Sequence, residues 1–539
     1  MEKYESAVSE KIETMWYKAM ETADSFVSRS YLDKLNLCRA AEPAEEMLVS
    51  FPIELFRLTR LAYIPSEGIV DKLVNVYSSL NSIGTTVFTI IHGEPGKTEF
   101  YIGCLNRSSS DASRLLLESS FEGNFPGIEL SLRNAREKDE LLDCFFPLEY
   151  RSQSIASVSV SADFRKNKTE DGIKYIQGIE KFIDTMKGKE YTALFLAEPV
   201  SHDDCMDKKR ACENMITELS KYNKIAVNYG QNDAVAVNTS LSEGTNESIS
   251  SSINSSVSKS TSVSIGKNKG SSFSRSFSFF GTTYSSGKNR GTTENSTTGY
   301  ADTTGSTKTN MTGSNFNKTT GESRNSGSSV GMTLNIENKA VSNIISKLEY
   351  ELKKLENSDS FGLWDTAVYI VSQDSSTPIV AANSIRSLVI GDESGKAESF
   401  INYWDRTSKA FSHGSVGNIM KFLHYGMHPV FEKNNGISGK SFFFTPAVAV
   451  GGNVLPSISG LPMRSVPGVT VIETAEFGRN VVTDDHSSPG NRTVRLGEIM
   501  YMGKKDSSIV KLHVNSLAMH TFICGAPGSG KSNTVYKLI

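Results

Sequence analysis

A glycine-rich octapeptide near the end of the chain constrains the fold more than any other sequence feature. Residues 525–532 read Gly-Ala-Pro-Gly-Ser-Gly-Lys-Ser and match the phosphate-loop pattern Gly-x-x-x-x-Gly-Lys-Ser/Thr at every fixed position. Such a loop joins an apolar strand to the start of a helix, and residues 521–524 and 533–539 have the composition for both. The sequence therefore predicts the first strand, loop and helix of an incomplete P-loop ATPase domain over residues 517–539.

Each position of this loop has a chemical reason to be there. The glycines let backbone N–H groups turn toward phosphate oxygens, Lys531 should reach the β- and γ-phosphates, and Ser532 should ligate Mg²⁺. The helix N-terminus adds a favourable partial positive charge. The predicted cofactors are therefore ATP and Mg²⁺, with Ser532 as the metal ligand. The predicted cofactor-binding residues are Gly525, Ala526, Pro527, Gly528, Ser529, Gly530, Lys531, Ser532 and Asn533.

Hydrolysis needs a further carboxylate on a second apolar strand. Two segments imitate such a strand, one ending at Glu198 and the other at Asp392 and Glu393. Both precede the loop, whereas in P-loop folds the corresponding strand follows it. We therefore predict no catalytic residue in these 539 residues and expect the chain alone to leave ATP unhydrolysed.

Composition excludes several function classes. The net charge of −3 provides no overall field that would draw the chain to nucleic acid or membrane. The six cysteines form no Cys-x-x-Cys motif, which argues against a zinc site or a disulfide framework. No apolar run reaches the length of ~18 residues that a membrane span needs, and the N-terminus does not read as a signal peptide. We expect a cytoplasmic protein with no membrane span.

The region 1–236 and its continuation over 333–430 read as a mixed α+β fold. Residues 1–48 have helical spacing, and strand and helix signals alternate after them, as in the strands expected at 85–91 and 98–104. A strong apolar stripe predicts a helix over about 341–355. We expect a small antiparallel sheet with helices on one face.

Residues 237–332 form a separate compositional block that interrupts this region. Ser, Thr, Gly and Asn dominate it, and nine basic residues stand against five acidic ones. Such a composition cannot bury enough apolar area to offset the entropy of ordering, which predicts a flexible insertion. Serine mostly alternates with larger side chains at residues 262–265 and 272–279, which is the period of a β-strand. An exposed β-arm therefore stays open as the alternative.

The region 441–516 reads as short strands separated by Gly, Pro and Asn. The strand signals fall at residues 469–473, 493–496, 499–502 and 509–512. This pattern predicts a small β-barrel or β-layer ahead of the P-loop.

Three segments of this C-terminal part carry a family resemblance. Residues 495–499, Arg-Leu-Gly-Glu-Ile, resemble a barrel strand, and residues 512–520 resemble a lead-in that ends at His520 just before the P-loop strand. Residues 528–535 extend the loop as Gly-Ser-Gly-Lys-Ser-Asn-Thr-Val. Together they resemble the HerA-like branch of the HerA/FtsK superfamily of P-loop ATPases. Upstream, residues 361–370 and the turn at 391–394 are similar to N-terminal regions of HerA-like and conjugative type IV secretion ATPases.

The resemblance implies the N-terminal part of a hexameric DNA translocase or helicase that binds ATP and acts on DNA, with a possible partner nuclease. The motor core of the family would follow Ile539, so the resemblance also implies a fragment of a longer protein. The barrel and the α+β region would then mediate assembly and partner docking. Two alternatives stay open: a conjugation or secretion ATPase, and a non-catalytic binding or scaffold protein.

Overall fold

The computed structural model describes most of the chain outside the Ser/Thr-rich block. The described residues are 20, 23–24, 26–44, 52–64, 67–105, 111–149, 153–161, 166–169, 172–175, 178–229, 236–237, 276–278, 281–283, 332–390, 399–405, 414–434, 441–475, 478, 492–517 and 519–539. All of the structural findings concern these residues.

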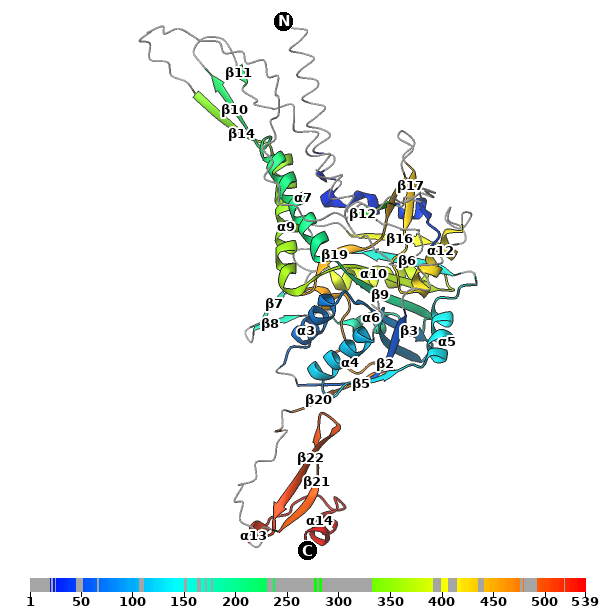
Figure 1. The fold of residues 1–539 in the computed structure, drawn as a ribbon, viewed down its shortest axis with the longest axis vertical. Helices are drawn as coiled ribbons and strands as arrows, with labels where there is room; N and C mark the ends of the chain where they lie inside the picture. Colours follow the sequence, from blue (N-terminus) through cyan, green and yellow to red (C-terminus); the bar gives the residue numbers. More distant parts are fainter. Residues whose placement is uncertain are drawn as a thin grey trace, which may run out of the picture.

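One large mixed sheet forms the centre of the fold (Figure 1). Its main path runs β16-β6-β15-β9-β3-β4-β2-β20, with β19 paired to β15 and β5 paired to β2. Neighbours are antiparallel except for β2 and β20, which are parallel. The strands are β2 (Ile53–Tyr63), β3 (Thr86–Glu94), β4 (Lys97–Leu105), β5 (Glu129–Leu132), β6 (Ser154–Ser159), β9 (Tyr191–Pro199), β15 (Leu363–Ser372), β16 (Phe400–Trp404), β19 (Val448–Gly451) and β20 (Thr470–Glu473). We refer to this sheet with its covering helices as the body.

Helices cover both faces of this sheet, so the expectation of helices on one face only is wrong. The first face packs against α3 (Ile69–Ser82), α4 (Ala112–Asn124), α6 (Ile179–Thr185) and α10 (Thr377–Val389). The second packs against α5 (Ala135–Phe145) and α12 (Ser415–His424). The cause is visible in the strands. Residues 86–93 of β3 are all buried, so side chains on both faces of this strand are covered. A strand covered on both faces has a nearly continuous apolar sequence instead of alternating apolar and polar residues.

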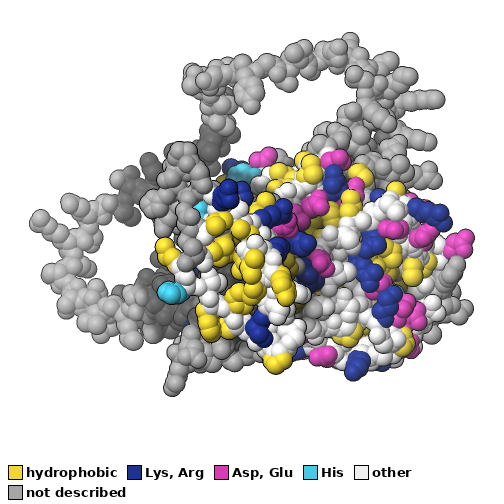
Figure 2. Space-filling view, turned by 90° about the horizontal axis from the view of Figure 1, so that it is seen from below, with side chains coloured by type: hydrophobic (Ala, Val, Ile, Leu, Met, Phe, Trp, Pro, Cys, Tyr) yellow, Lys and Arg dark blue, Asp and Glu magenta, His cyan; other side chains and the backbone are white. Residues whose placement is uncertain are grey.

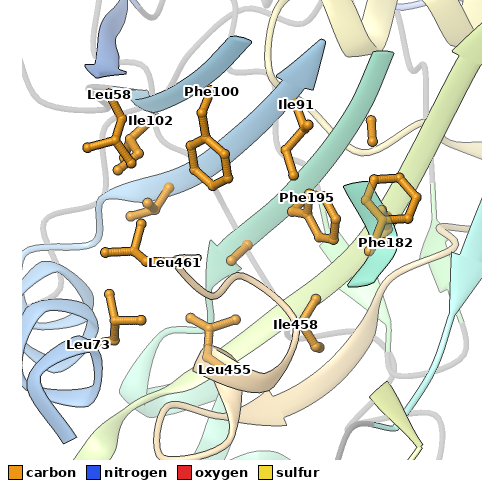
Figure 3. Close-up of a cluster of buried hydrophobic side chains, with 14 of the residues drawn as sticks. Leu58, Leu73, Ile91, Phe100, Ile102, Phe182, Phe195, Leu455, Ile458 and Leu461 are labelled. Carbon is orange, nitrogen blue, oxygen red and sulfur yellow. The ribbon is translucent and has the colours of Figure 1, made fainter. Parts of the chain in front are cut away.

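The first core is closed by a loop that lies across the strands. Figure 3 shows Leu455, Ile458 and Leu461 of this loop facing Phe195 and Phe100 of the sheet. Leu455 belongs to the short turn η4 (Leu455–Ser457). Burial of each such side chain contributes roughly 1.5–3 kcal/mol, so this loop contributes to the stability of the body.

Two long helices leave the sheet from adjacent strands. The chain passes from β9 into α7 (His202–Ser220) and β10 (Lys224–Tyr229), and returns through β14 (Met332–Glu337) and α9 (Lys339–Phe361) into β15. Figure 1 shows α7 and α9 side by side, with β10 and β14 beyond them. We call α7 and α9 the stalk. The helix expected over 341–355 is confirmed and forms the middle of α9.

The Ser/Thr-rich block lies between the far ends of this stalk. Of residues 237–332, the structure describes the two ends and a small hairpin of β12 (Ser276–Ser278) and β13 (Gly281–Thr283). The choice between a flexible insertion and a β-arm therefore falls outside the described residues. The chain enters this block after β10 and leaves it at β14, and the described hairpin contacts β18.

The expected barrel over 441–516 is not found among the described residues. The strands of this region separate: β18 (Ser441–Phe444) pairs with β17 (Phe431–Asn434), while β19 and β20 join the large sheet. The remaining two, β21 (Thr493–Tyr501) and β22 (Lys504–His513), form a two-stranded hairpin. The strands expected at 469–473 and 509–512 correspond to β20 and to part of β22, whereas those expected at 493–496 and 499–502 form the single strand β21. Sequence spacing could not assign the partners of these strands, since pairing depends on distant residues.

The N-terminal region differs from its prediction as well. Residues 26–28 are helical, but the short turns η1 (Ser30–Leu32) and η2 (Leu35–Leu37) and the strand β1 (Arg39–Ala40) follow them. Residues 1–19 lie outside the described part of the chain. Within the described part, no helix has the length and apolar character that crossing a membrane would require.

Candidate functional site

The glycine-rich loop has the backbone that its sequence predicts. Gly528 and Gly530 both have positive φ, at 79° and 85°, a conformation in which a residue with a side chain would be strained. A Cβ added to Gly525 would stand 2.5 Å from Oγ of Ser529, so the loop also approaches itself closely at its first glycine. The conformation of the loop therefore favours glycine at positions 528 and 530.

A helix begins directly after the loop. α14 (Lys531–Leu538) starts at the loop lysine, and Gly530 is its N-cap residue. The N–H of Thr534 donates to the carbonyl of Gly530 at 3.0 Å, which closes the first turn. Its first turn thus presents backbone N–H groups toward the loop, where an anion is favoured.

The loop lysine points back onto the loop itself. Nζ of Lys531 donates to the carbonyl oxygens of Gly525 and Ala526, at 2.6 and 2.8 Å. An ammonium held in this way lies within the curve of the loop, at the place where a phosphate would contact it. Ser532 follows in the first turn of α14 and is exposed. The residues present therefore fit a nucleotide phosphate with its Mg²⁺.

The strand expected at residues 521–524 is not formed. The segment is extended without a partner, and Phe522 is 89% exposed. A β-strand is defined by its ladder of hydrogen bonds, and none of the described strands pairs with this segment. The loop and the helix form from local interactions, whereas the strand needs a neighbour.

A hairpin connects this site to the body. β21 and β22 pair antiparallel, with register shifts between Arg495 and Gly497 and between Glu498 and Met500. Its turn carries Met502, which is 6% exposed and packs against Ala62 and Ile64 of the body. Bulges increase the local twist of a hairpin, and here they lie between the P-loop unit and its contact with the body.

The contact of Met502 with the body is narrow but closely fitted. A Cβ on Gly127 would stand 2.4 Å from Cβ of Ala62 and 2.7 Å from the carbonyl oxygen of Met502. Arg60 reaches the carbonyl of Gly503 at 3.5 Å. We call this contact the joint. The joint could not be predicted from local sequence, because its fit depends on Ala62, Gly127 and Met502, which are far apart in the chain.

Exposed apolar side chains gather in residues 493–539, which we call the C-terminal unit. Figure 2 looks onto the molecule from this end and shows hydrophobic side chains among Lys and Arg. Those that are exposed here are Met500, Ile509, Val514, Met519, Phe522, Val535, Tyr536 and Ile539. Tyr536 is 80% exposed and Ile539 97%. A concentration of exposed apolar side chains is typical of a surface to which further protein binds.

The carboxylates that imitate a catalytic strand are elsewhere. Glu198 belongs to β9, where its backbone pairs with Asp365 in the body. Asp392 and Glu393 lie outside the described residues. Within the described part of the chain, no carboxylate forms an ion pair with Lys531, and no three His, Cys, Asp or Glu residues come together as metal ligands. The site therefore consists of the loop, its lysine and Ser532.

Comparison with known proteins adds no relative: no protein-family model matches the chain, and no curated protein matches it either.

Proposed function

We propose that the chain binds Mg-ATP at residues 525–532, as the N-terminal portion of a HerA-like DNA-translocating ATPase. The observation that carries the proposal is the loop backbone, with Gly528 and Gly530 in left-handed conformations directly before a helix that starts at Lys531. Backbone N–H groups then bind the phosphates, Lys531 neutralises their charge, and Ser532 holds Mg²⁺. The metal would supply positive charge beside the phosphates.

The same proposal assigns the body to assembly and partner docking. The support for this assignment is a difference between the two regions. The body has a hydrophobic core on both faces of its sheet, whereas the C-terminal unit has exposed apolar side chains. The motor form is proposed to be a homo-hexamer that acts on DNA, with a nuclease as a possible partner. The apolar surface supports this because further protein must cover it.

Nucleotide binding is tested by titrating the 539-residue chain with ATP and Mg²⁺ in a calorimeter. Saturable binding is expected, and Lys531→Ala should weaken it about tenfold or more because a charge-assisted contact to phosphate is lost. Lys537→Ala is the matched control, since Lys537 lies on the same helix in its last turn. Binding that Lys531→Ala leaves unchanged would refute the proposed site.

Hydrolysis is a separate measurement. We expect no steady-state ATPase activity from this chain, because Ser532 has no carboxylate partner among the described residues with which to complete the metal site. Activity that disappears in Lys531→Ala would show that a carboxylate in the chain completes the site after all.

The DNA assignment is tested on the product expressed from its native locus. Binding to duplex DNA that weakens steeply with salt is expected for a translocase. Copurification with membrane secretion components instead would favour a secretion ATPase. The absence of both results would favour a scaffold protein.

A further inference from the structure

A buried charge cluster lies where the N-terminal segment meets the stalk. Nη2 of Arg29 donates to Oε2 of Glu351 at 3.0 Å, and these side chains are only 7% and 8% exposed. Nζ of Lys354 lies 3.4 Å from both carboxylate oxygens of Glu351 and donates to Oγ of Ser161 at 3.0 Å. One carboxylate thus faces two cations inside the protein.

This cluster is only partly satisfied. Nη1 of Arg29 is buried and has no hydrogen-bond partner among the described residues. Arg29 also has φ of 50°, in the left-handed region that non-glycine residues rarely adopt. Burial lowers the pKa of Lys354 in spite of Glu351, while the two cations outweigh burial and lower the pKa of Glu351. A buried ion cluster of this kind is costly to desolvate, and removing one member leaves a buried charge unpaired.

The segment before Arg29 covers the seam between the stalk helices. Ala23, Phe26 and Val27 are each at most 3% exposed and pack in one cluster with α7 and α9. The residues of the seam beneath them include Cys212 and Leu348, both fully buried. Cys212 thus belongs to the same buried cluster as the apolar side chains of the cover. Burial raises the pKa of Cys212.

The stalk and its cover differ in how they are anchored. The stalk helices continue into β9 and β15, which pair with each other from Trp364↔Pro199 onward, and the N–H of Val200 donates to the carbonyl of Leu363 at 2.9 Å. Ser358 and Cys205 also contact each other across the stalk, at 3.2 Å. The described part of the cover is held by the apolar side chains of Met20, Ala23, Phe26 and Val27 together with the ion pair of Arg29. Segments with few buried contacts open at a lower free energy than the sheet does.

We propose that Ala23, Phe26, Val27 and Arg29 form a releasable clasp over the seam of α7 and α9, locked by the Arg29–Glu351–Lys354 cluster. Opening requires rotation at Arg29, where the left-handed backbone already stores strain. On the other side of this hinge the chain stays attached, since Nδ2 of Asn402 donates to the carbonyl of Leu32 at 2.9 Å. The open form presents the apolar seam between α7 and α9. The proposal does not depend on the nucleotide site.

The natural cysteines provide the test. Cys144 and Cys524 are exposed, Cys212 lies under the clasp, and Cys104 is fully buried in the large sheet. A neutral maleimide, followed by mass spectrometry of the peptides, gives a labelling rate for each thiol. In Glu351→Gln, Cys212 should react roughly tenfold faster or more, while Cys104 keeps the rate of the unmodified protein. Glu349→Gln is the matched control, because Glu349 is an exposed carboxylate on the same helix.

A second measurement keeps the proposal testable should Glu351→Gln fold poorly. In the unmodified protein, the labelling rate of Cys212 should depend weakly on low denaturant concentrations, whereas that of Cys104 should rise steeply with denaturant. A weak dependence is typical of local opening and a steep one of global unfolding. Equal denaturant dependence of the two thiols, or an unchanged Cys212 rate in a folded Glu351→Gln protein, would overturn the clasp.

Discussion

The body and the C-terminal unit differ in how far their apolar side chains are buried. In the body, Trp364 and Phe195 are at most 1% exposed between strands and helices that come from distant parts of the chain. In the C-terminal unit, Phe522 is 89% exposed, although it belongs to an equally apolar segment. The same residue type is thus core in one region and surface in the other. The difference shows that hydrophobicity decides burial only where the fold supplies a partner.

The two regions also differ in what fixes their geometry. Tertiary packing holds the body, whereas local hydrogen bonds and glycine conformations hold the P-loop, as in the bonds from Lys531 to Gly525 and Ala526. The joint at Met502 connects the two. Changes in the body should therefore alter stability, and changes in the loop should alter binding.

The largest effect is expected from truncating one aromatic side chain in each region. Phe195→Ala should lower the free energy of unfolding of the body by about 3–5 kcal/mol, because it removes a fully buried ring and leaves a cavity. Phe522→Ala should change it by no more than about 0.5 kcal/mol, since that ring is exposed. Denaturant titration of both variants checks the pair. A comparable loss in Phe522→Ala would show that the C-terminal unit packs against more protein than the structure describes.

Alkaline pH should weaken the body through its buried tyrosines. Burial raises the pKa of Tyr77 to about 12, and its hydroxyl donates to the carbonyl of Ser459. The unfolded chain ionises this phenol near its ordinary value of 10.0, so this contribution is intact below pH 10 and is lost as pH rises toward 12. The loss corresponds to about 2–3 kcal/mol. Between pH 10 and 12, the free energy of unfolding should fall less steeply with pH in Tyr77→Phe than in the unmodified protein. An identical pH dependence of the two proteins would contradict the role assigned to Tyr77.

A larger side chain at position 127 should weaken the contact between the body and the C-terminal unit, with a smaller loss of stability than the two changes above. Gly127→Ala places a methyl group against Ala62 and Met502 and should cost about 1–3 kcal/mol at the contact. Trypsin should then cut faster at Lys504, beside the displaced turn, where Nζ lies 3.7 Å from Glu122. Gly123→Ala is the control, since a Cβ there meets nothing within 4 Å. Equal cleavage rates in both variants would mean that the joint does not hold the hairpin.

The smallest effect on stability is expected at the nucleotide site. Lys531→Ala should shift the free energy of unfolding by less than about 0.5 kcal/mol, because its partners are carbonyls of an exposed loop. Thermal unfolding without nucleotide checks this against Phe195→Ala. A large loss of stability would mean that the lysine organises more than its own loop.

Local signals predicted much of the secondary structure and the loop. The strands expected at 85–91 and 98–104 correspond to β3 and β4, and the helix expected over 341–355 lies inside α9. These elements have strong periodicity or a clear turn between them, such as the one at Gly96, whose φ is 86°. The nucleotide assignment, the hexamer and the DNA substrate remain predictions.

The partners of the strands could not be predicted from local sequence patterns. The barrel expected over 441–516 is not formed among the described residues, because β19 pairs with β15 and β20 pairs with β2, and both partners lie outside this region. The strand expected at 521–524 failed for the same reason, as it has no neighbour among the described strands. A period of two residues shows that a strand is extended but not which strand lies beside it.

The sequence by itself determined the conformation of the glycine-rich loop, because Gly528, Gly530 and Lys531 act within a few residues of each other and need only local geometry. Only the tertiary structure decided the two-sided sheet, the joint at Gly127 and the buried meeting of Arg29 with Glu351. The physical reason is the range of the interactions. Backbone conformation and hydrogen bonds within a turn are encoded by neighbouring residues, whereas packing and ion pairing depend on which distant segments the whole fold brings together.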